Sequence, residues 1–211
     1  MYIEKLLLKV KAVSLSPTKP FVYASGNKGP IYCDNRILIS LPEMREKIIQ
    51  EMLRIINREK IPFNVIAGTA TAGIPWASFL ADRLKKPMIY VRDKKKNHGM
   101  QNQIEGILGR NENVLLIEDT INFGTSIAAA LQALKEQGAK VEHCIAIYSH
   151  EHRSAEQQFQ REPCRMHVLA GFSKLIAIAE QMKAITAEEK KMLEAWHQDP
   201  EMWSKEYERL S

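Results

Sequence analysis

The stretch from Val114 to Ser126 combines residue types that could bind a phosphorylated sugar. Four apolar residues, Val114 to Ile117, predict a buried strand, and two carboxylates, Glu118 and Asp119, follow it directly. A turn and a helix come next, so backbone N–H groups and hydroxyls gather at a helix N-terminus, where the dipole favours an anion. Two carboxylates beside such a cradle suit a ligand that also carries ribose hydroxyls or Mg²⁺.

The same stretch also has an ordinary structural interpretation. Glu118 and Asp119 fit a solvated strand end, and Thr125 or Ser126 fits the N-cap of the following helix. Strand–turn–helix units of this composition are common, so spacing alone favours the ligand-binding and the structural interpretation equally.

A basic cluster lies between two predicted strands, and Gly99 and Gly106 are candidate hinges on its C-terminal side. Its cationic side chains are Arg92, Lys94, Lys95, Lys96 and His98. A charge run is usually a solvated face, but this position in the chain favours binding of a small phosphorylated substrate.

Small residues from Thr69 to Gly73 follow a predicted strand. Such residues let the backbone approach a ligand closely, so that successive N–H groups can bind phosphate oxygens. The alternative is an ordinary strand-to-helix turn whose small side chains serve packing.

Strands and helices alternate along the chain, which predicts βαβ units and a mostly parallel sheet. The expected strands are residues 64–67, 87–91, 114–117, 141–149 and 168–171. The expected helices are residues 42–60, with Ser40 as a cap, 74–84 and 126–137. The N-terminal residues predict an amphipathic helix, and Thr186 with Glu189 predicts a capping box for a helix through Trp196.

The length of 211 residues suits one domain, residues 1–211, with a small hood from about residue 1 to 40 and helices at the C-terminus. The net charge of +5 comes without a long basic stripe, so we expect neither nucleic acid nor membrane as a partner. The three cysteines, an odd number, predict reduced thiols and a cytoplasmic location. His143, His150, His152 and His167 show no ligand spacing, and we expect them on the surface.

Four segments in family order give the chain a resemblance to orotate phosphoribosyltransferases, which are type I phosphoribosyltransferases. The hydrophobic strand, Glu118-Asp119 and the Gly124-Thr125-Ser126 turn resemble the signature that binds phosphoribosyl diphosphate. The other three segments resemble the orotate-site segment, the pyrophosphate loop and the mobile catalytic loop: residues 21–36, FVYASGNKGPIYCDNR, 67–75, AGTATAGIP, and 90–106, YVRDKKKNHGMQNQIEG.

The resemblance implies the type I phosphoribosyltransferase fold and transfer of a phosphoribosyl group to orotate, which gives orotidine 5′-monophosphate and diphosphate in pyrimidine biosynthesis. It implies Mg²⁺ as cofactor, held mainly by the substrate with Asp119 as a candidate ligand. It also implies a homodimer in which each mobile loop closes over the partner's site. Transfer to another base, and a non-catalytic regulator that senses phosphoribosyl diphosphate, remain the alternatives.

The resemblance also assigns residues to roles. Phosphoribosyl diphosphate would contact Thr69, Ala70, Thr71, Ala72, Arg92, Lys96, His98, Glu118, Asp119, Thr120, Ile121, Asn122, Phe123, Gly124, Thr125 and Ser126. Orotate would contact Lys28, Tyr32, Cys33 and Asn122. Catalysis would fall to Lys96, His98 and Asp119.

Some residues depart from the family pattern or keep a second interpretation. Asn122 replaces Thr or Ser, and Phe123 replaces a small residue, so Phe123 either packs outward or narrows the pocket. Asp93 adds an anion beside the basic cluster. Lys28 fits a turn residue, and Tyr32 a core aromatic, as well as they fit a base-binding site.

Overall fold

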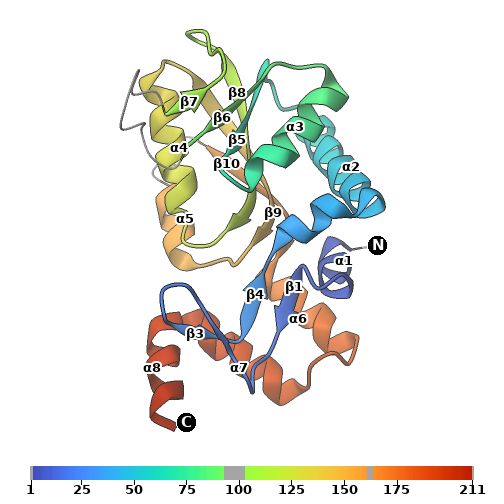
Figure 1. Ribbon diagram of the computed structural model, residues 1–211, viewed down its shortest axis with the longest axis vertical. Coiled ribbons are helices and arrows are strands. Elements are labelled where there is room, and N and C mark those ends of the chain that lie inside the picture. Colours follow the sequence, from blue (N-terminus) through green and yellow to red (C-terminus); the bar gives the residue numbers. More distant parts are fainter. Residues whose placement is uncertain (1, 93–102, 161–163, 211) are drawn as a thin grey trace. The chain divides into compact units, whose positions relative to one another are not determined.

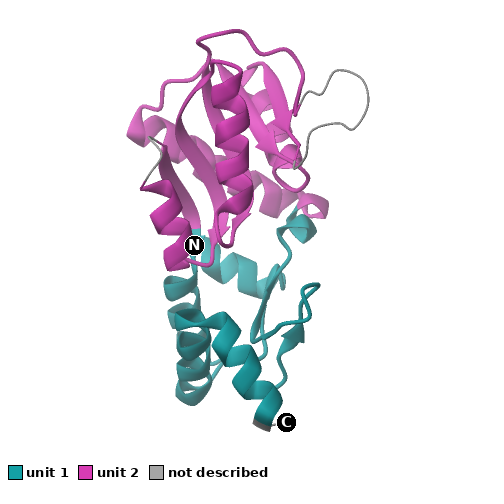
Figure 2. Cartoon of the chain, turned by 90° about the vertical axis from the view of Figure 1, so that its left-hand side faces the viewer, with its two compact units in different colours: residues 1–38, 170–211 teal, residues 39–169 magenta. Residues whose placement is uncertain are grey.

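The computed structural model describes residues 2–92, 103–160 and 164–210. The chain divides into two compact units, coloured separately in Figure 2. Unit 1 consists of residues 1–38 and 170–211, the two ends of the chain, and unit 2 consists of residues 39–169. The assignment of residues 1–211 to a single domain stays a prediction.

Among the described residues, unit 2 is built on a six-stranded sheet with the order β10-β9-β8-β5-β6-β7. The strands are β5 (Val65–Thr69), β6 (Met88–Val91), β7 (Ile104–Glu105), β8 (Asn113–Ile121), β9 (Lys140–Ser149) and β10 (Arg165–Gly171). β5 runs parallel to both β6 and β8, and β8 runs parallel to β9, whereas β7 is antiparallel to β6. The predicted α/β fold with a mostly parallel sheet is confirmed.

Helices cover both faces of this sheet (Figure 1). They are α2 (Pro42–Glu59), α3 (Gly73–Leu84), α4 (Thr125–Glu136) and α5 (Arg153–Phe159). On one face, α3 packs on β5 and β8 and buries Trp76 and Leu80 completely. On the other face, Leu116 of β8 and Leu134 of α4 share a buried apolar cluster. Because the central strands are buried on both faces, they read as continuous apolar runs in the sequence.

Local sequence explains where the helices begin and end. Pro42 occupies the first turn of α2, where its missing N–H costs nothing, and Lys60 ends the helix in the left-handed conformation. The predicted Ser40 cap is wrong, because the capping position is Leu41 and makes no side-chain hydrogen bond there. Ser40 instead ends the short 3₁₀ helix η1 (Asn35–Ser40).

Unit 1 joins the N-terminal hairpins to the C-terminal helices. It contains α1 (Ile3–Lys9), β1 (Val13–Leu15), β2 (Phe21–Val22), β3 (Lys28–Gly29), β4 (Ile31–Cys33), α6 (Phe172–Gln181), α7 (Ala187–Gln198) and α8 (Pro200–Leu210). β1 pairs with β4, and β2 pairs with β3, both antiparallel. The predicted N-terminal helix is confirmed, and so is the capping box of α7, in which Thr186 and Glu189 each accept from the other's backbone N–H.

Contacts between the two ends of the chain hold unit 1 together. The buried Glu4 of α1 pairs with Lys174 of α6 at 3.1 Å, and the backbone N–H of Lys28 donates to Ser204 of α8 at 2.8 Å. Among the described residues, no helix has both the length and the apolar character needed to cross a bilayer.

Candidate active site

Strand β8 extends further than the sequence predicts. It continues through Glu118 and Asp119 to Ile121, because β9 runs beside it and pairs Ile121 with Ser149. The expected strand end at Ile117 is therefore wrong, and the turn consists of residues 122–124. As the carboxyl ends of parallel strands share one edge, β8 delivers its polar residues to the edge where ligands bind in open α/β sheets.

Glu118 and Asp119 occupy different environments, because successive side chains of a strand point to opposite faces. Glu118 is only 5% exposed, so the interpretation as a solvated strand end is wrong for this residue. Its Oε1 accepts the Asp119 backbone N–H at 2.9 Å. Burial, and after it the negative charge of Asp119, raises the pKa of the Glu118 carboxyl to about 8.

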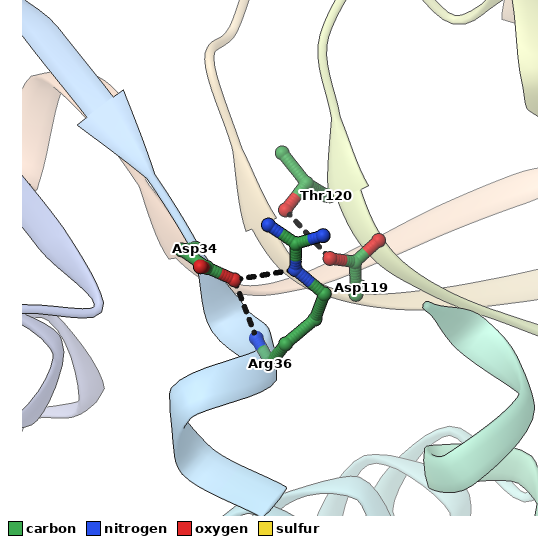
Figure 3. A network of polar contacts seen from close by, with 4 residues as sticks. All are labelled: Asp34, Arg36, Asp119 and Thr120. Carbon is green, nitrogen blue, oxygen red and sulfur yellow. Dashed lines mark hydrogen bonds and ion pairs between the residues drawn. The ribbon is translucent and has the colours of Figure 1, made fainter. Parts of the chain in front are cut away.

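Asp119 is half-buried and accessible, and Thr120 Oγ1 donates to its Oδ2 at 3.3 Å (Figure 3). The hydrogen bond restricts the carboxylate from one side. At this strand end, Asp119 is therefore better placed than Glu118 to present a charged oxygen to a ligand.

The turn after β8 leads directly into α4. Gly124 has a φ of +82°, a left-handed conformation that favours glycine, and it occupies the capping position without a side-chain hydrogen bond. Thr125 and Ser126 are therefore not the N-cap, and both are exposed in the first turn of the helix. Their hydroxyls, together with the first backbone N–H groups of α4, are available to an anion.

The loop after β5 also lies at this edge. Thr69 is buried and its hydroxyl donates to the Ile117 carbonyl at 3.2 Å, while the Ala70 N–H donates to the Val91 carbonyl at 2.8 Å. The peptide bond between Ala70 and Thr71 is cis. At Gly73, a Cβ would lie 2.5 Å from Thr69 Oγ1 and 2.6 Å from the Ile117 carbonyl oxygen, so only glycine fits here.

Arg92 follows β6 and pairs with Glu105 of β7 at 3.3 Å. The Arg92 backbone N–H donates to the Gln103 carbonyl at 2.8 Å, so these two residues, which flank the segment between them, are held together. The remaining cationic residues of the basic cluster, and two neighbours named above, lie outside the described residues: Asp93, Lys94, Lys95, Lys96, His98 and Gly99. Their roles stay predictions.

A pocket of about 190 Å³ brings three of the sequence segments together. It is lined by Thr69, Val91, Arg92, Thr125, Ser126, Ala129 and Ala130. The walls come from the ends of β5 and β6 and from the first turns of α4. A guanidinium, two hydroxyls and a helix N-terminus around one pocket are suited to bind a phosphorylated ligand.

Three of the four residues predicted to bind the base, Lys28, Tyr32 and Cys33, lie in unit 1, whereas Asn122 lies in unit 2. Lys28 is in β3, and its Nζ is 4.0 Å from Glu208 of α8. Tyr32 is 43% exposed and lies against the Phe21 ring, so the alternative of a core aromatic is wrong. Cys33 is half-buried at the end of β4, where Asp34 accepts a hydrogen bond of 2.6 Å from Arg36 (Figure 3).

The prediction of surface histidines is wrong for three of the four. His150, His152 and His167 are buried, with exposed fractions of 8%, 4% and 7%. Nδ1 of His143 lies 3.0 Å from Nε2 of His167, and burial lowers the pKa of His167. The polar neighbours of His152 in the sequence, Glu151 and Arg153, hide burial that arises from packing against a distant segment, the turn that contains Phe123.

Two contributions to this edge carry no clear sequence signal. Glu105, the ion-pair partner of Arg92, lies in the segment 90–106 but the resemblance assigns it no role, and the sequence predicts His152, which stacks on Phe123 of the turn, on the surface. The ring of His152 explains where Phe123 packs, with 4.8 Å between the centroids. Phe123 itself remains 44% exposed.

Among the described residues, no three His, Cys, Asp or Glu side chains come together as a metal ligand set. The accessible Asp119 carboxylate is nevertheless the hard oxygen donor that Mg²⁺ prefers. Magnesium is commonly held by one or two carboxylates together with substrate phosphates. The donor set therefore fits an ion that arrives with a diphosphate ligand.

An acidic strand end beside a cationic pocket at the carboxyl edge of a parallel sheet defines an α/β protein that binds a sugar phosphate. Comparison with known proteins agrees, since residues 41–173 match the model of the phosphoribosyl transferase domain. An orotate phosphoribosyltransferase of Coxiella burnetii is 48% identical over 95% of this chain and 96% of its own length. Another, of Bacillus pumilus, is 43% identical over 97% of both chains.

A solved structure extends the comparison to the fold. The crystal structure of orotate phosphoribosyltransferase from Aeropyrum pernix superposes with a TM-score of 0.74 at 28% identity, over 87% of this chain and 99% of that one. The chain belongs to the phosphoribosyltransferase family and, within it, to the orotate phosphoribosyltransferases.

Proposed function

We propose that this protein transfers the phosphoribosyl group of phosphoribosyl diphosphate to orotate, a step of pyrimidine biosynthesis. In the reaction, the bond from C1 of ribose to diphosphate breaks and a bond from C1 to the base nitrogen forms. The observation that carries the proposal is the pocket in which Thr69, Arg92, Thr125 and Ser126 meet, since they come from three separate family motifs. The relatives' names supply the base.

Phosphate binding falls to the backbone and to Arg92. The turn from Asn122 to Ser126 would hold the 5′-phosphate, because the first N–H groups of α4 have no partner within the helix. Residues 69–72 would hold the diphosphate, with the backbone N–H groups of Thr71 and Ala72 as the candidate donors, because the Ala70 N–H already donates to the Val91 carbonyl. Arg92, already oriented by Glu105, would supply positive charge to the leaving group.

The two carboxylates would act differently on the ribose. Asp119 presents an accessible oxygen that can accept from a ribose hydroxyl and oppose the positive charge that develops on the ring as diphosphate leaves. Glu118 is buried and its raised pKa keeps the carboxyl protonated at neutral pH in the absence of ligand. It can therefore donate one hydrogen bond without adding a second negative charge beside Asp119.

Magnesium would bind with the substrate. The ion would be held mainly by the substrate, and Asp119 would be the candidate protein ligand. When bound, the ion would neutralise charge on the leaving diphosphate.

Orotate binding is assigned by the family resemblance to Lys28, Tyr32, Cys33 and Asn122. Asn122 is exposed at the turn after β8 and offers both a donor and an acceptor. The ammonium group of Lys28 suits the orotate carboxylate. These assignments rest on motif position.

The segment between β6 and β7 would close the site. Lys96 and His98, outside the described residues, would help the diphosphate to leave, and closure would exclude water. By the family pattern the loop serves the partner subunit, so we propose a homodimer. We also propose a cytoplasmic location, consistent with three cysteines that form no disulfide.

A competition assay tests the function. The protein is incubated with phosphoribosyl diphosphate, Mg²⁺ and equal amounts of orotate, uracil, hypoxanthine and adenine, and the products are separated by chromatography. We expect orotidine 5′-monophosphate as the main nucleotide. A different nucleotide would overturn the choice of base, and binding of phosphoribosyl diphosphate without any product would indicate a sensor instead of an enzyme.

A further inference from the structure

The turn between β8 and α4 packs against a segment that belongs to none of the family motifs. Phe123, in the middle of the turn, stacks on His152 with 4.8 Å between ring centroids and 15° between the planes. His152 directly precedes α5 and is only 4% exposed. A bulky side chain in an exposed turn is thus held by a buried ring of unit 2.

The stack continues into the core of unit 2. His150 stacks on His152 at 5.6 Å, and Tyr148 of β9 meets His150 edge-on at 5.0 Å. Tyr148 is fully buried. Four aromatic rings therefore connect the turn to the centre of a rigid strand, so the position of His152 is set by core packing and not by the turn.

The backbone of the turn is held by the same segment. The His150 N–H donates to the Ile121 carbonyl at 2.9 Å. At Gly124, a Cβ would lie 3.0 Å from Gln158 Oε1 and 3.2 Å from the Cα of Ala155, so α5 packs closely against the turn. Residues 121, 123 and 124 thus each contact the segment from His150 to Phe159.

We infer that His152 is a positioning residue for phosphoribosyl diphosphate: by clamping Phe123, it holds the turn and the first N–H groups of α4 in the geometry that the 5′-phosphate needs. The inference rests on the proposed function, since that function places the 5′-phosphate at this turn. A turn that is already ordered loses less conformational entropy when the ligand binds, and tighter binding results.

Kinetic measurements can distinguish a positioning role of His152 from a catalytic one. His152 lies behind the turn and is assigned no contact with the base or the leaving group. Its loss should weaken binding of phosphoribosyl diphosphate while turnover at saturation stays the same. A purely structural stack would lower the melting temperature and leave the substrate affinity of the folded protein unchanged.

The test compares four variants: His152→Ala, His152→Phe, Phe123→Ala and the double alanine variant. Calorimetry with phosphoribosyl diphosphate and Mg²⁺ gives the dissociation constant, and steady-state kinetics give kcat and both KM values. We expect each single alanine variant to weaken binding by roughly three- to tenfold, the range of one aromatic pair. The double variant should be no weaker than either single one, because both remove the same contact.

His152→Phe keeps a flat ring against Phe123 and should restore the affinity. The matched control is His197→Ala, which removes a comparable stack, 4.5 Å between the centroids of His197 and Phe172, inside unit 1. That control should bind as the wild type does. Phe123 is exposed, so Phe123→Ala tests the inference even if His152→Ala does not fold.

Unchanged affinity in both single alanine variants, or fully additive losses in the double variant, would overturn the inference. The calorimetric measurement does not depend on the base. If the wild type binds phosphoribosyl diphosphate but forms no product with orotate, the proposed function fails, and weaker binding by His152→Ala would still support the positioning role.

Discussion

The adjacent carboxylates of β8 differ because a strand alternates its side chains between two faces. Glu118 is buried and its pKa is raised, whereas Asp119 stays accessible beside the Thr120 hydroxyl. The pair therefore combines a neutral donor with a charged acceptor. We therefore expect the same replacement, of a carboxyl by an amide, to have different effects at Glu118 and at Asp119.

Replacing Asp119 by asparagine removes the negative charge that would oppose the cation developing on the ribose. We expect kcat/KM to fall by roughly 10²–10³-fold, as for other electrostatic groups that face a transition state. Steady-state assays with orotate and phosphoribosyl diphosphate measure the loss. The matched control is Glu112→Gln, which also removes one negative charge. Glu112 directly precedes β8, at the end of the strand opposite to the site, and accepts a hydrogen bond from the Asn64 side chain. Wild-type activity in Asp119→Asn would refute the role of this carboxylate.

Replacing Glu118 by glutamine should change the pH dependence of stability. The pKa of the Glu118 carboxyl is about 8 in the folded state, above its value in the unfolded state. Between these two pKa values the folded state therefore binds the proton more tightly than the unfolded state does. Wild-type stability therefore falls as pH rises from the unfolded pKa towards 8, by at most about 1.4 kcal/mol per pH unit. Glutamine never ionises and lacks this loss.

Urea denaturation of the wild type and of Glu118→Gln at a series of pH values between 5 and 9 measures this difference. The free energies of unfolding should diverge in favour of the variant as pH rises, and then stay a constant distance apart above pH 8. Parallel curves across the whole range would contradict the raised pKa.

Sequence motifs predict which residues gather at the site better than they predict how each is placed. Thr69, Arg92, Thr125 and Ser126 meet in one pocket, because strand ends of a parallel sheet share an edge. The burial of His152 could not be predicted. Its neighbours in sequence are polar, and its burial arises from packing against a turn some thirty residues away.

At the scale of elements, the type and order of helices and strands follow from periodicity, and the boundaries do not. The charges of Glu118 and Asp119 suggest the end of a strand. β8 continues past both of them because β9 supplies hydrogen-bond partners as far as Ser149. Pairing with a neighbour, which a single segment cannot reveal, thus moves the turn four residues along the chain.

The start of α3 is packed so closely that Gly73→Ala should damage the site. Its Cβ would meet Thr69 Oγ1 and the Ile117 carbonyl, so α3 or the loop must shift. We expect a loss of stability of about 1–3 kcal/mol, typical of overpacking, together with weaker binding of phosphoribosyl diphosphate. Denaturation and calorimetry measure the two effects.

The matched control for this variant is Gly109→Ala, whose Cβ would have its three nearest neighbours in the flexible side chain of Glu112. That variant should keep both its stability and its affinity. If Gly73→Ala behaves like the control, the close approach of α3 to β5 and β8 is not required for ligand binding.

The loop between β6 and β7 makes a kinetic prediction. Lys96→Ala and His98→Ala should lower kcat by roughly 10²-fold or more, as for other groups that assist a leaving group, with a much smaller rise in KM. Steady-state kinetics separate the two constants, and Lys86→Ala, outside the loop, is the control. Equal losses in kcat and in affinity would mean that the loop only anchors the diphosphate.

At the scale of the whole molecule, the chain folds into two compact units, and the two ends of the sequence form one of them. The sequence predicts the sheet of unit 2 well, since its strands are apolar and regularly spaced. It predicts unit 1 poorly. Strands of two residues such as β2 and β3 carry almost no periodicity, and the packing of β3 on α8 joins segments more than 170 residues apart.

The proposed homodimer makes a prediction that no single-residue variant tests. If the loop of one subunit completes the site of its partner, Asp119→Asn and Lys96→Ala damage different halves of each site. A hybrid of the two variants then contains one site with both defects and one intact site. Chains refolded together in equal amounts should regain about a quarter of wild-type activity, because half of the dimers are hybrids and each hybrid has one intact site of two.

The control replaces the Lys96→Ala chain by the double variant Asp119→Asn/Lys96→Ala, which cannot form an intact site with Asp119→Asn and should restore no activity. Activity no higher than that of the separate variants, in a preparation shown by mass to contain hybrids, would mean that each loop serves its own subunit.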